Sequence, residues 1–335
     1  MISKRLDSRV DILRFRAVCT SWRCSVSLPS FDQELPLILD VPDPISVAAL
    51  LFQTTISRME LVRKDPNSSS PSLSKTWLVK VGESNYGKLQ LFNPLTNQEI
   101  KHCLAPLSLD EFMFVELSKA FLLKLPSGSS VFGINKVVLF PVSANSSDGT
   151  EFGILAIFHE VELAYWKYGD ENWILLDTLE NAQYDDIIVY RAQVYVVDRW
   201  GTVSWIDSSL NVIQYSPSLY SCGGQKHLVE CCGDLYVVDR VYKLDEEWGK
   251  WIDVKSLDDK VFVLGMDCSF SFSSREFNGG KGNCIYYVDN DDYVDTGLSP
   301  ESIHVFHLED RSIYKLAAIP EFSEIFWPPR NGSSL

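Results

Sequence analysis

The pentapeptide YVVDR occurs twice in this chain, at Tyr195–Arg199 and again at Tyr236–Arg240, 41 residues later. A related stretch, YYVD, follows at Tyr286–Asp289. Each copy is rich in aromatic and β-branched residues, which favours a β-strand, and each leads into a further strand-like run. We therefore expect the three copies to occupy equivalent inner strands in different copies of one structural repeat.

A second repeated feature is a hairpin in which two strand-like runs flank a polar turn. The five examples are LQLFNPLTNQEIKHCL from Leu89, LAYWKYGDENWILLD from Leu163, VSWIDSSLNVIQYS from Val203, VYKLDEEWGKWIDV from Val241 and IHVFHLEDRSIYKL from Ile303. Their starts are separated by 74, 40, 38 and 62 residues. A unit of about 40 residues explains the two middle gaps. The first gap then spans two units, with one copy between the two hairpins whose pattern is indistinct. The last gap contains an insertion near residues 271–283.

A repeat of this length with four short strands is typical of a β-propeller blade, because each four-stranded sheet buries both faces against its neighbours. We therefore predict an all-β fold with a single β-propeller over residues 31–330. Five visible units and one inferred unit favour six blades, with seven left open. The alternative all-β fold is a two-sheet sandwich, which does not require a repeat near 40 residues.

Residues 1–28 differ from the rest because they are predicted to be α-helical, as one helix or as a helix–turn–helix. The apolar residues that recur there at steps of three and four are Ile12, Phe15, Cys19, Trp22 and Val26. Pro29 ends this pattern. The first 30 residues carry a net charge of +4 and the remainder −19. We therefore expect a small helical module over residues 1–30 and a disordered tail over residues 331–335.

The composition limits the classes of function. Of the 335 residues, 46% are hydrophobic and 22% charged, as in a globular protein. The formal net charge of −15 argues against nucleic-acid binding, which needs a basic face. No apolar run reaches the length of about 20 residues that a membrane-spanning helix needs, and no signal-peptide core follows Lys4 and Arg5. We expect neither nucleic acid nor membrane as a partner, and a location in the cytoplasm, the nucleus or both.

The usual signatures of metal and catalytic sites are incomplete in this sequence. The eight cysteines include no C-x-x-C pair, and Cys222, His227 and Cys231 match no standard zinc spacing. A zinc-protease-like HE at residues 159–160 lacks its second histidine, because Leu163 occupies that place. No G-x-S-x-G nucleophile motif occurs. We therefore predict reduced cysteines, no bound metal, no cofactor and no enzymatic activity.

Two parts of the chain resemble a known family of plant proteins. RFRAVCTSWR at Arg14–Arg23, preceded by ISKRL at Ile2–Leu6 and by Asp11 and Ile12, is similar to the second half of an F-box. The stretches that resemble the KIB-type β-propeller, which follows the F-box in that family, are LFNPLT at 91–96, LVECCGDLY at 228–236, KWIDVKSL at 250–257 and KGNCIY at 281–286. The resemblance covers most of the chain, and the last three stretches are the most specific.

The resemblance implies a substrate-recognition subunit of an SCF-type E3 ubiquitin ligase. In that class the F-box helices bind a Skp-type adaptor and, through it, a cullin, while the propeller binds the target protein, which the sequence does not identify. The residues that correspond to adaptor-contacting positions are Leu6, Ile12, Leu13, Val18, Cys19 and Trp22. For Val18 and Trp22, packing between the helices is an equal alternative.

One departure from the family concerns the start of the F-box. Family members open with an L-P-x-E-L helix, and Met1 follows the place where that helix would end. Either the true start lies upstream or part of the adaptor contact is lost. We therefore expect residues 1–335 to bind the adaptor weakly and an added L-P-x-E-L helix to restore tight binding. The alternative function is an orphan β-propeller scaffold that binds a partner without coupling it to ubiquitination.

Overall fold

The computed structural model defines the propeller region of the chain. The residues that it describes are 37–41, 47–61, 75–83, 89–100, 112–142, 151–159, 162–176, 182–220, 224–277, 280–288, 303–316 and 325–326. The helices predicted within residues 1–30 and the tail predicted at 331–335 lie outside them. Within the described ranges, no helix is long and apolar enough to cross a membrane.

The first structural unit contains strands β1 to β5. Their bounds are Leu37–Asp40 (β1), Ala48–Leu61 (β2), Thr76–Glu83 (β3), Leu89–Phe92 (β4) and Phe112–Lys124 (β5). They pair in the order β4-β3-β2-β5, and β1 pairs with the beginning of β2. The single pair Phe121–Val137 joins β5 to the next unit, so that the two units form one nine-stranded sheet.

The next three units are four-stranded antiparallel meanders. The second unit comprises β6 (Ile134–Pro141), β7 (Phe152–Phe158), β8 (Glu162–Lys167) and β9 (Ile174–Leu175). The third comprises β10 (Tyr184–Tyr190), β11 (Gln193–Asp198), β12 (Val203–Ile206) and β13 (Val212–Gln214). The fourth comprises β14 (His227–Cys231), β15 (Asp234–Val238), β16 (Val241–Asp245) and β17 (Lys250–Asp253). In each unit the strands pair in sequence order.

The fifth unit has five strands and a different topology. It contains β18 (Lys260–Leu264), β19 (Ser269–Ser273), β20 (Cys284–Val288), β21 (Ile303–His307) and β22 (Ser312–Lys315), with the 3-10 helix η2 (Ser274–Glu276) after β19. The order is β19-β18-β20-β21-β22, and β18 pairs in parallel with β20.

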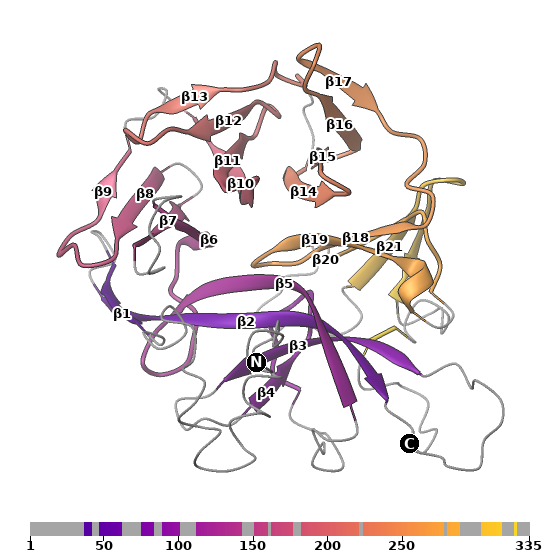
Figure 1. The fold of residues 1–335 in the computed structure, drawn as a ribbon, viewed down its shortest axis with the longest axis horizontal. Coiled ribbons are helices and arrows are strands. Elements are labelled where there is room, and N and C mark those ends of the chain that lie inside the picture. Colours follow the sequence, from indigo (N-terminus) through magenta and orange to yellow (C-terminus); the bar gives the residue numbers. More distant parts are fainter. Residues whose placement is uncertain are drawn as a thin grey trace, which may run out of the picture.

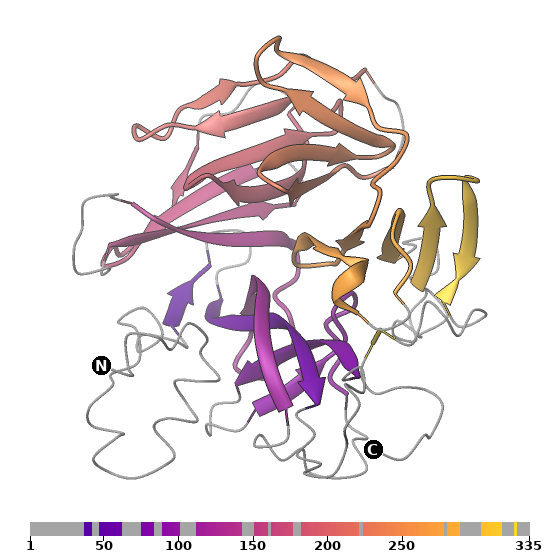
Figure 2. The same ribbon diagram turned by 45° about the vertical axis from the view of Figure 1, so that its right-hand side comes forward.

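The five units close into a ring, as Figure 1 shows along its axis and Figure 2 from an oblique direction. Every pair of neighbouring units, the fifth and first included, shares a cluster of buried side chains. Two members of each cluster, in ring order, are Leu51 and Ala156, Leu155 and Val196, Val197 and Leu235, Val229 and Phe262, and Val305 and Leu78. The C-terminal Phe326 pairs with Leu78 of β3 and joins the end of the chain to the first unit. Both faces of a blade are therefore covered, which explains why all seven residues of β7 are buried.

The predicted all-β propeller is confirmed, whereas the number of units differs from our expectation. The described residues form a ring of five units, not six. We expected a further unit between Leu89 and Leu163, but the described residues there are β5, which completes the first unit, and β6 and β7, which begin the second. The 13 residues of β5 pair along almost the whole of β2, so this segment lengthens one sheet instead of adding another.

The repeated motifs have the positions that we expected in most cases. The last four predicted hairpins form and contribute the two outermost strands of their units. Of the first, the structure shows β4 and the isolated pair Phe92–Glu99, and residues 101–104 of its second run lie outside the described residues. Tyr195 and Tyr236 lie in β11 and β15, the second strands of the third and fourth units. The expectation for Tyr286 was wrong, because β20 is the third strand from the axis. The β18–β19 hairpin occupies the two inner positions of that unit.

Candidate functional site

The predicted adaptor-binding residues Leu6, Ile12, Leu13, Val18, Cys19 and Trp22 lie outside the described residues, so their contact with an adaptor stays a prediction. The structure instead provides two features of the ring that could bind a partner. One is the cavity along the axis, and the other is the set of turns at one end of the ring.

The innermost strands β5, β6, β10, β14 and β19 surround an axial cavity of about 580 Å³. Its apolar lining includes Val137, Ile187 and Leu228, while Lys119, Glu230 and Cys232 add polar groups. A cavity of this volume falls in the range of small-molecule sites.

Lysine–aspartate pairs cross the unit boundaries around the axis. Lys136 of β6 pairs with Asp186 of β10, and both side chains are almost completely buried. The same carboxylate accepts hydrogen bonds from the backbone N–H of Ile187 at 2.6 Å and of Leu228 at 2.8 Å. Asp186 therefore links the second, third and fourth units.

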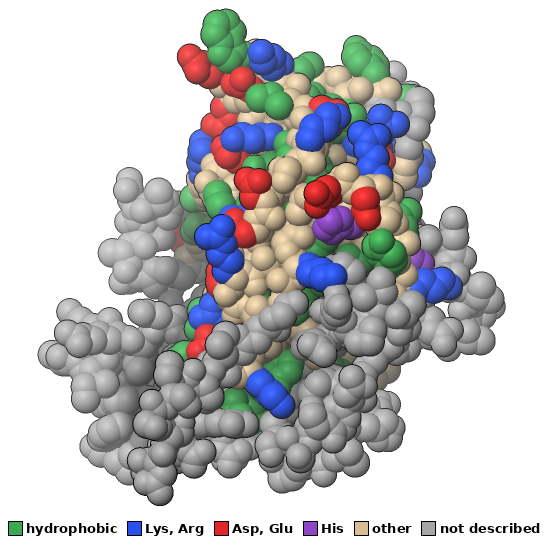
Figure 3. All heavy atoms as spheres, turned by 90° about the vertical axis from the view of Figure 1, so that its right-hand side faces the viewer, with side chains coloured by type: hydrophobic (Ala, Val, Ile, Leu, Met, Phe, Trp, Pro, Cys, Tyr) green, Lys and Arg blue, Asp and Glu red, His purple; other side chains and the backbone are tan. Residues whose placement is uncertain are grey.

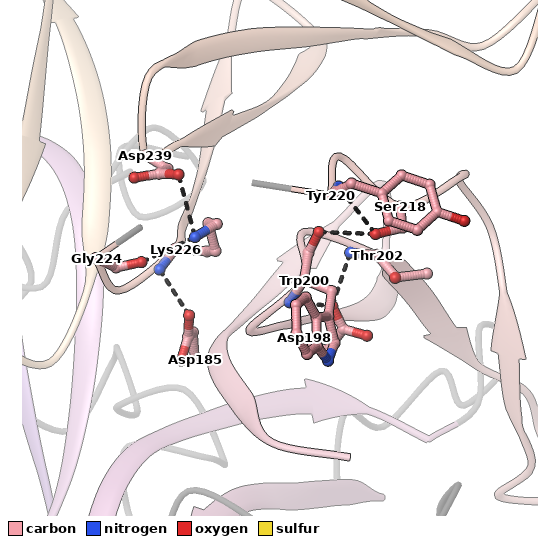
Figure 4. Close-up of polar contacts among 9 residues, drawn as sticks. All are labelled: Asp185, Asp198, Trp200, Thr202, Ser218, Tyr220, Gly224, Lys226 and Asp239. Atoms are coloured by element: carbon pink, nitrogen blue, oxygen red, sulfur yellow. Dashed lines mark hydrogen bonds and ion pairs between the residues drawn. The ribbon is translucent and has the colours of Figure 1, made fainter. Parts of the chain in front are cut away.

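Lys226, just before β14, makes a second group of contacts at the boundary between the third and fourth units (Figure 4). Its ammonium lies 3.1 Å from a carboxylate oxygen of Asp239 and donates to the carbonyl of Gly224 at 2.9 Å. Its backbone N–H donates to the carboxylate of Asp185 at 2.8 Å. Asp239 is therefore paired with a buried lysine, and the Asp185 carboxylate is held by a backbone N–H group.

A third pair joins the fifth unit to the first. The Lys80 ammonium lies 2.5 Å from Asp267 Oδ2, with both side chains fully buried, and it also donates to the side-chain oxygen of Asn97. Lys124 lies 3.8 Å from the centre of the Phe52 ring. Burial and the nearby Lys80 ammonium lower the pKa of Lys124 below its ordinary value, while Asp267 opposes this shift.

The three buried cysteines among the described residues do not have the properties of catalytic nucleophiles. Burial raises the pKa of Cys268 and Cys284 to about 12 and that of Cys231 to about 11. All three are therefore protonated at neutral pH, whereas a nucleophilic cysteine needs its thiolate. The four described cysteines, which include Cys232, form no disulfide. In the described ranges no three His, Cys, Asp or Glu side chains are grouped to hold a metal ion.

His227 is a partly buried titratable group close to these ion pairs. Burial is the main cause that lowers its pKa from 6.5 to about 4; Lys136 and Lys226 act in the same direction and Asp186 opposes them. The imidazole is therefore neutral in the folded protein at pH 7.

We expect His227 to make the protein less stable in mild acid. As the pH falls from 6.5 to about 4, the unfolded chain takes up a proton at this side chain before the folded protein does. The free energy of unfolding should therefore decrease by at most about 3 kcal/mol over this window, and the change should be absent above the ordinary histidine pKa. Urea unfolding of wild type and His227→Gln between pH 4 and pH 8 measures it. The variant should lose less stability in acid; equal slopes below pH 6.5 would contradict the assignment.

The second candidate feature is the turn face, which we define as residues 198–202, 215–220, 224–226 and 239–240. In the antiparallel third unit, β10 begins, β11 ends, β12 begins and β13 ends at this edge. The contacts of Asp185 with Lys226 and of Asp186 with Leu228 hold the start of β14 beside the start of β10. The corresponding turns of the third and fourth units therefore lie at the same end of the ring.

The turn between β11 and β12 is organised by Asp198. One carboxylate oxygen accepts hydrogen bonds from the backbone N–H groups of Trp200 at 2.9 Å and Thr202 at 2.8 Å. Gly201 has a φ of +77°, and a Cβ atom at this position would lie 2.8 Å from Leu219. Glycine is needed here for both the backbone conformation and the close packing.

The neighbouring segment 215–220 is attached to the ring at several points. The buried hydroxyl of Ser216 accepts the N–H of Val203 at 2.9 Å, and the indole N–H of Trp251 donates to the carbonyl of Pro217 at 2.8 Å. The Ser218 hydroxyl donates to the carbonyl of Trp200 at 2.9 Å (Figure 4). The two segments of the turn face are therefore held in fixed positions relative to each other.

The lateral surface in Figure 3 carries interspersed basic and acidic side chains over the part that is described. Such a mixed surface is typical of a solvated side of a protein.

A closed ring of blade-sized sheets around an axial cavity defines the protein as a β-propeller. The KIB1-4 beta-propeller family matches residues 49–307, and the chain belongs to this family. The resemblance to plant proteins with an F-box and a KIB-type propeller is thereby confirmed.

Similar proteins occur in Arabidopsis thaliana. "Putative F-box protein At1g65770" is 32% identical over 327 residues, which cover 87% of this chain and 86% of that protein. "Probable F-box protein At1g65740" is 28% identical, with coverage of 98% and 95%. "F-box protein SKIP23" is 26% identical, with coverage of 98% and 92%.

Proposed function

We propose that this chain is the substrate-recognition subunit of an SCF-type ubiquitin ligase, acting in the cytoplasm, the nucleus or both. The observation that carries the proposal is its similarity, over nearly the full length of both chains, to proteins named as F-box proteins. The F-box-like sequence within residues 2–23 supports the same role.

In this role the two parts of the chain bind different partners. The F-box-like segment binds a Skp-type adaptor, which recruits a cullin, and the propeller binds the target protein. The chain itself carries out no bond chemistry. It raises the effective concentration of a target lysine near the ubiquitin-conjugating enzyme.

The first test of this function is adaptor binding. Leu13→Glu places a charge in an apolar interface, so we expect the affinity for a purified Skp-type adaptor to fall by at least about tenfold. Isothermal titration of the full chain against the adaptor measures this change. Trp248→Ala, in the turn between β16 and β17, is the control and should leave adaptor affinity unchanged.

The alternative, a scaffold that is not coupled to ubiquitination, predicts a different result. In that case the wild-type chain would not bind the adaptor, with or without an added L-P-x-E-L helix, and Leu13→Glu would change nothing. Either finding would contradict the ligase role.

A further inference from the structure

The turn face carries two exposed aromatic side chains, Trp200 and Tyr220. Trp200 is 54% exposed and Tyr220 is 83% exposed. The backbone of each is nevertheless fixed, because Trp200 N–H donates to Asp198 and Tyr220 N–H donates to the Ser218 hydroxyl at 3.1 Å (Figure 4). Ser218 contacts both residues, so a single hydroxyl couples the two positions. Large aromatic side chains that a well-defined backbone presents to solvent are typical of binding hot spots.

The backbone of Tyr220 gives an independent indication. Its φ is +49°, in the left-handed region that a bulky residue rarely adopts. This conformation is unfavourable, and the tyrosine ring gains little from it by burial within the chain. Strained residues of this kind are concentrated at ligand-binding positions, where the strain presents a side chain to a partner.

The charges on the turn face come from equivalent positions of the repeat. Arg199 and Arg240 are the last residues of the two YVVDR copies, and both are exposed at the ends of β11 and β15. Arg199 donates to the neutral side chain of Gln183 at 2.8 Å, so this contact leaves its positive charge uncompensated.

The acidic residues beside the two arginines are already engaged within the protein. Asp198 accepts two backbone N–H groups, Asp239 pairs with Lys226, and Asp185 accepts the backbone N–H of Lys226. The exposed charged side chains of the turn face are therefore the two arginines, whereas these three carboxylates are buried or only partly exposed.

We propose that the turn face is the docking surface for the target protein, and that it binds an acidic segment in which aromatic or aliphatic side chains alternate with carboxylates. Arg199 and Arg240 bind the carboxylates, because guanidinium groups form charge-assisted and often bidentate hydrogen bonds with them. Trp200 and Tyr220 cover the apolar side chains between them. This assignment rests on the proposed function, and it selects one end of the ring as the end that faces the target.

Electrostatics make this recognition selective. An acidic segment is repelled by a protein of net charge −15, so it gains affinity only where local basic groups outweigh that repulsion. The expected complex is accordingly sensitive to the two arginines and to salt.

The experiment uses the full chain and a fluorescein-labelled random copolymer of glutamate and tyrosine as the acidic probe. We expect the wild type to bind this probe, and both Trp200→Ala and the double variant Arg199→Ala/Arg240→Ala to lose about tenfold or more in affinity by fluorescence anisotropy. The matched controls are Trp248→Ala, which removes a 71% exposed tryptophan next to Lys250, and Arg275→Ala, which removes an exposed arginine. Both controls should bind like the wild type.

Three results would overturn the proposal: no binding of the acidic copolymer by the wild type, equal loss in the controls, or stronger binding of a lysine–tyrosine copolymer. Thermal unfolding of each variant shows whether it is folded, and a folded Trp200→Phe variant should keep most of the affinity. Adaptor titration separates this proposal from the ligase role. Variants of the turn face should bind the adaptor normally even if they do not bind the probe. If the ligase role is wrong, the wild-type chain will not bind the adaptor.

Discussion

Replacing Lys80 with methionine should lower the free energy of unfolding by about 3–5 kcal/mol. The Lys80 side chain is fully buried, and its ammonium pairs with the equally buried Asp267 at 2.5 Å. The other carboxylate oxygen of Asp267 is buried with no hydrogen-bond partner, so removal of Lys80 leaves an uncompensated charge in the interior. The effect should be large because the pair lies where the fifth unit closes on the first.

Two further variants separate the charge effect from general damage to the ring. Lys119→Met, which removes a half-exposed lysine 3.9 Å from Glu116, should change stability by no more than about 0.5 kcal/mol. Lys80→Met/Asp267→Leu should recover most of the loss, because replacing both buried charges with apolar groups removes the unpaired carboxylate. Urea unfolding followed by tryptophan fluorescence measures all three proteins. If the double variant is no more stable than Lys80→Met, the loss of stability in Lys80→Met does not come from the unpaired charge of Asp267.

The strand content and the hairpins could be predicted from the sequence because both are encoded locally. The hairpin from Val203 has a polar turn at Asp207–Asn211, and the structure closes it through contacts of Asp207 with Ser209 and Asn211. Four of the predicted hairpins become the outer two strands of their blades for the same reason. The number of units depended instead on β5, and the position of Tyr286 depended on β20; the pairings of both strands join distant segments. A local pattern carries little information about such pairings.

The buried lysines could not be recognised from the strand pattern. In TWLVKVGE, the side chains of Trp77, Val79 and Val81 share one face of β3, so Lys80 would be expected on a solvated face. A propeller blade covers both faces of its sheet, and Lys80 is buried as a result. The burial of Lys80 follows from the position of β3 within the ring. The alternation of side chains along the strand does not reveal it.

The turn face was predictable only in part. The repeat placed Arg199 and Arg240 at equivalent positions, which the structure confirms for β11 and β15. The role of Trp200 and Tyr220 had no sequence signal, because their exposure follows from Asp198, Gly201 and the attachment of residues 215–220 to the ring.

Asp186→Ala is the substitution that should damage the centre of the ring most directly, with an expected loss of about 3–5 kcal/mol in the free energy of unfolding. The Asp186 carboxylate compensates the buried Lys136 ammonium and accepts the N–H groups of Ile187 and Leu228. Alanine removes all three contacts at once, and each buried polar group left without a partner destabilises the folded state. Asp253→Ala, which removes an exposed carboxylate paired with Lys255, is the control and should have little effect.

The double variant Lys136→Met/Asp186→Ala distinguishes the two parts of this loss. It removes the unpaired ammonium but leaves the N–H groups of Ile187 and Leu228 without their acceptor. We therefore expect it to recover only part of the stability, unlike Lys80→Met/Asp267→Leu, whose carboxylate accepts no backbone N–H in the described contacts. Chemical unfolding of the single and double variants gives the coupling energy between Lys136 and Asp186. A complete recovery would mean that the backbone hydrogen bonds to Asp186 contribute nothing, and the carboxylate would then be only a counter-ion and not a link among three blades.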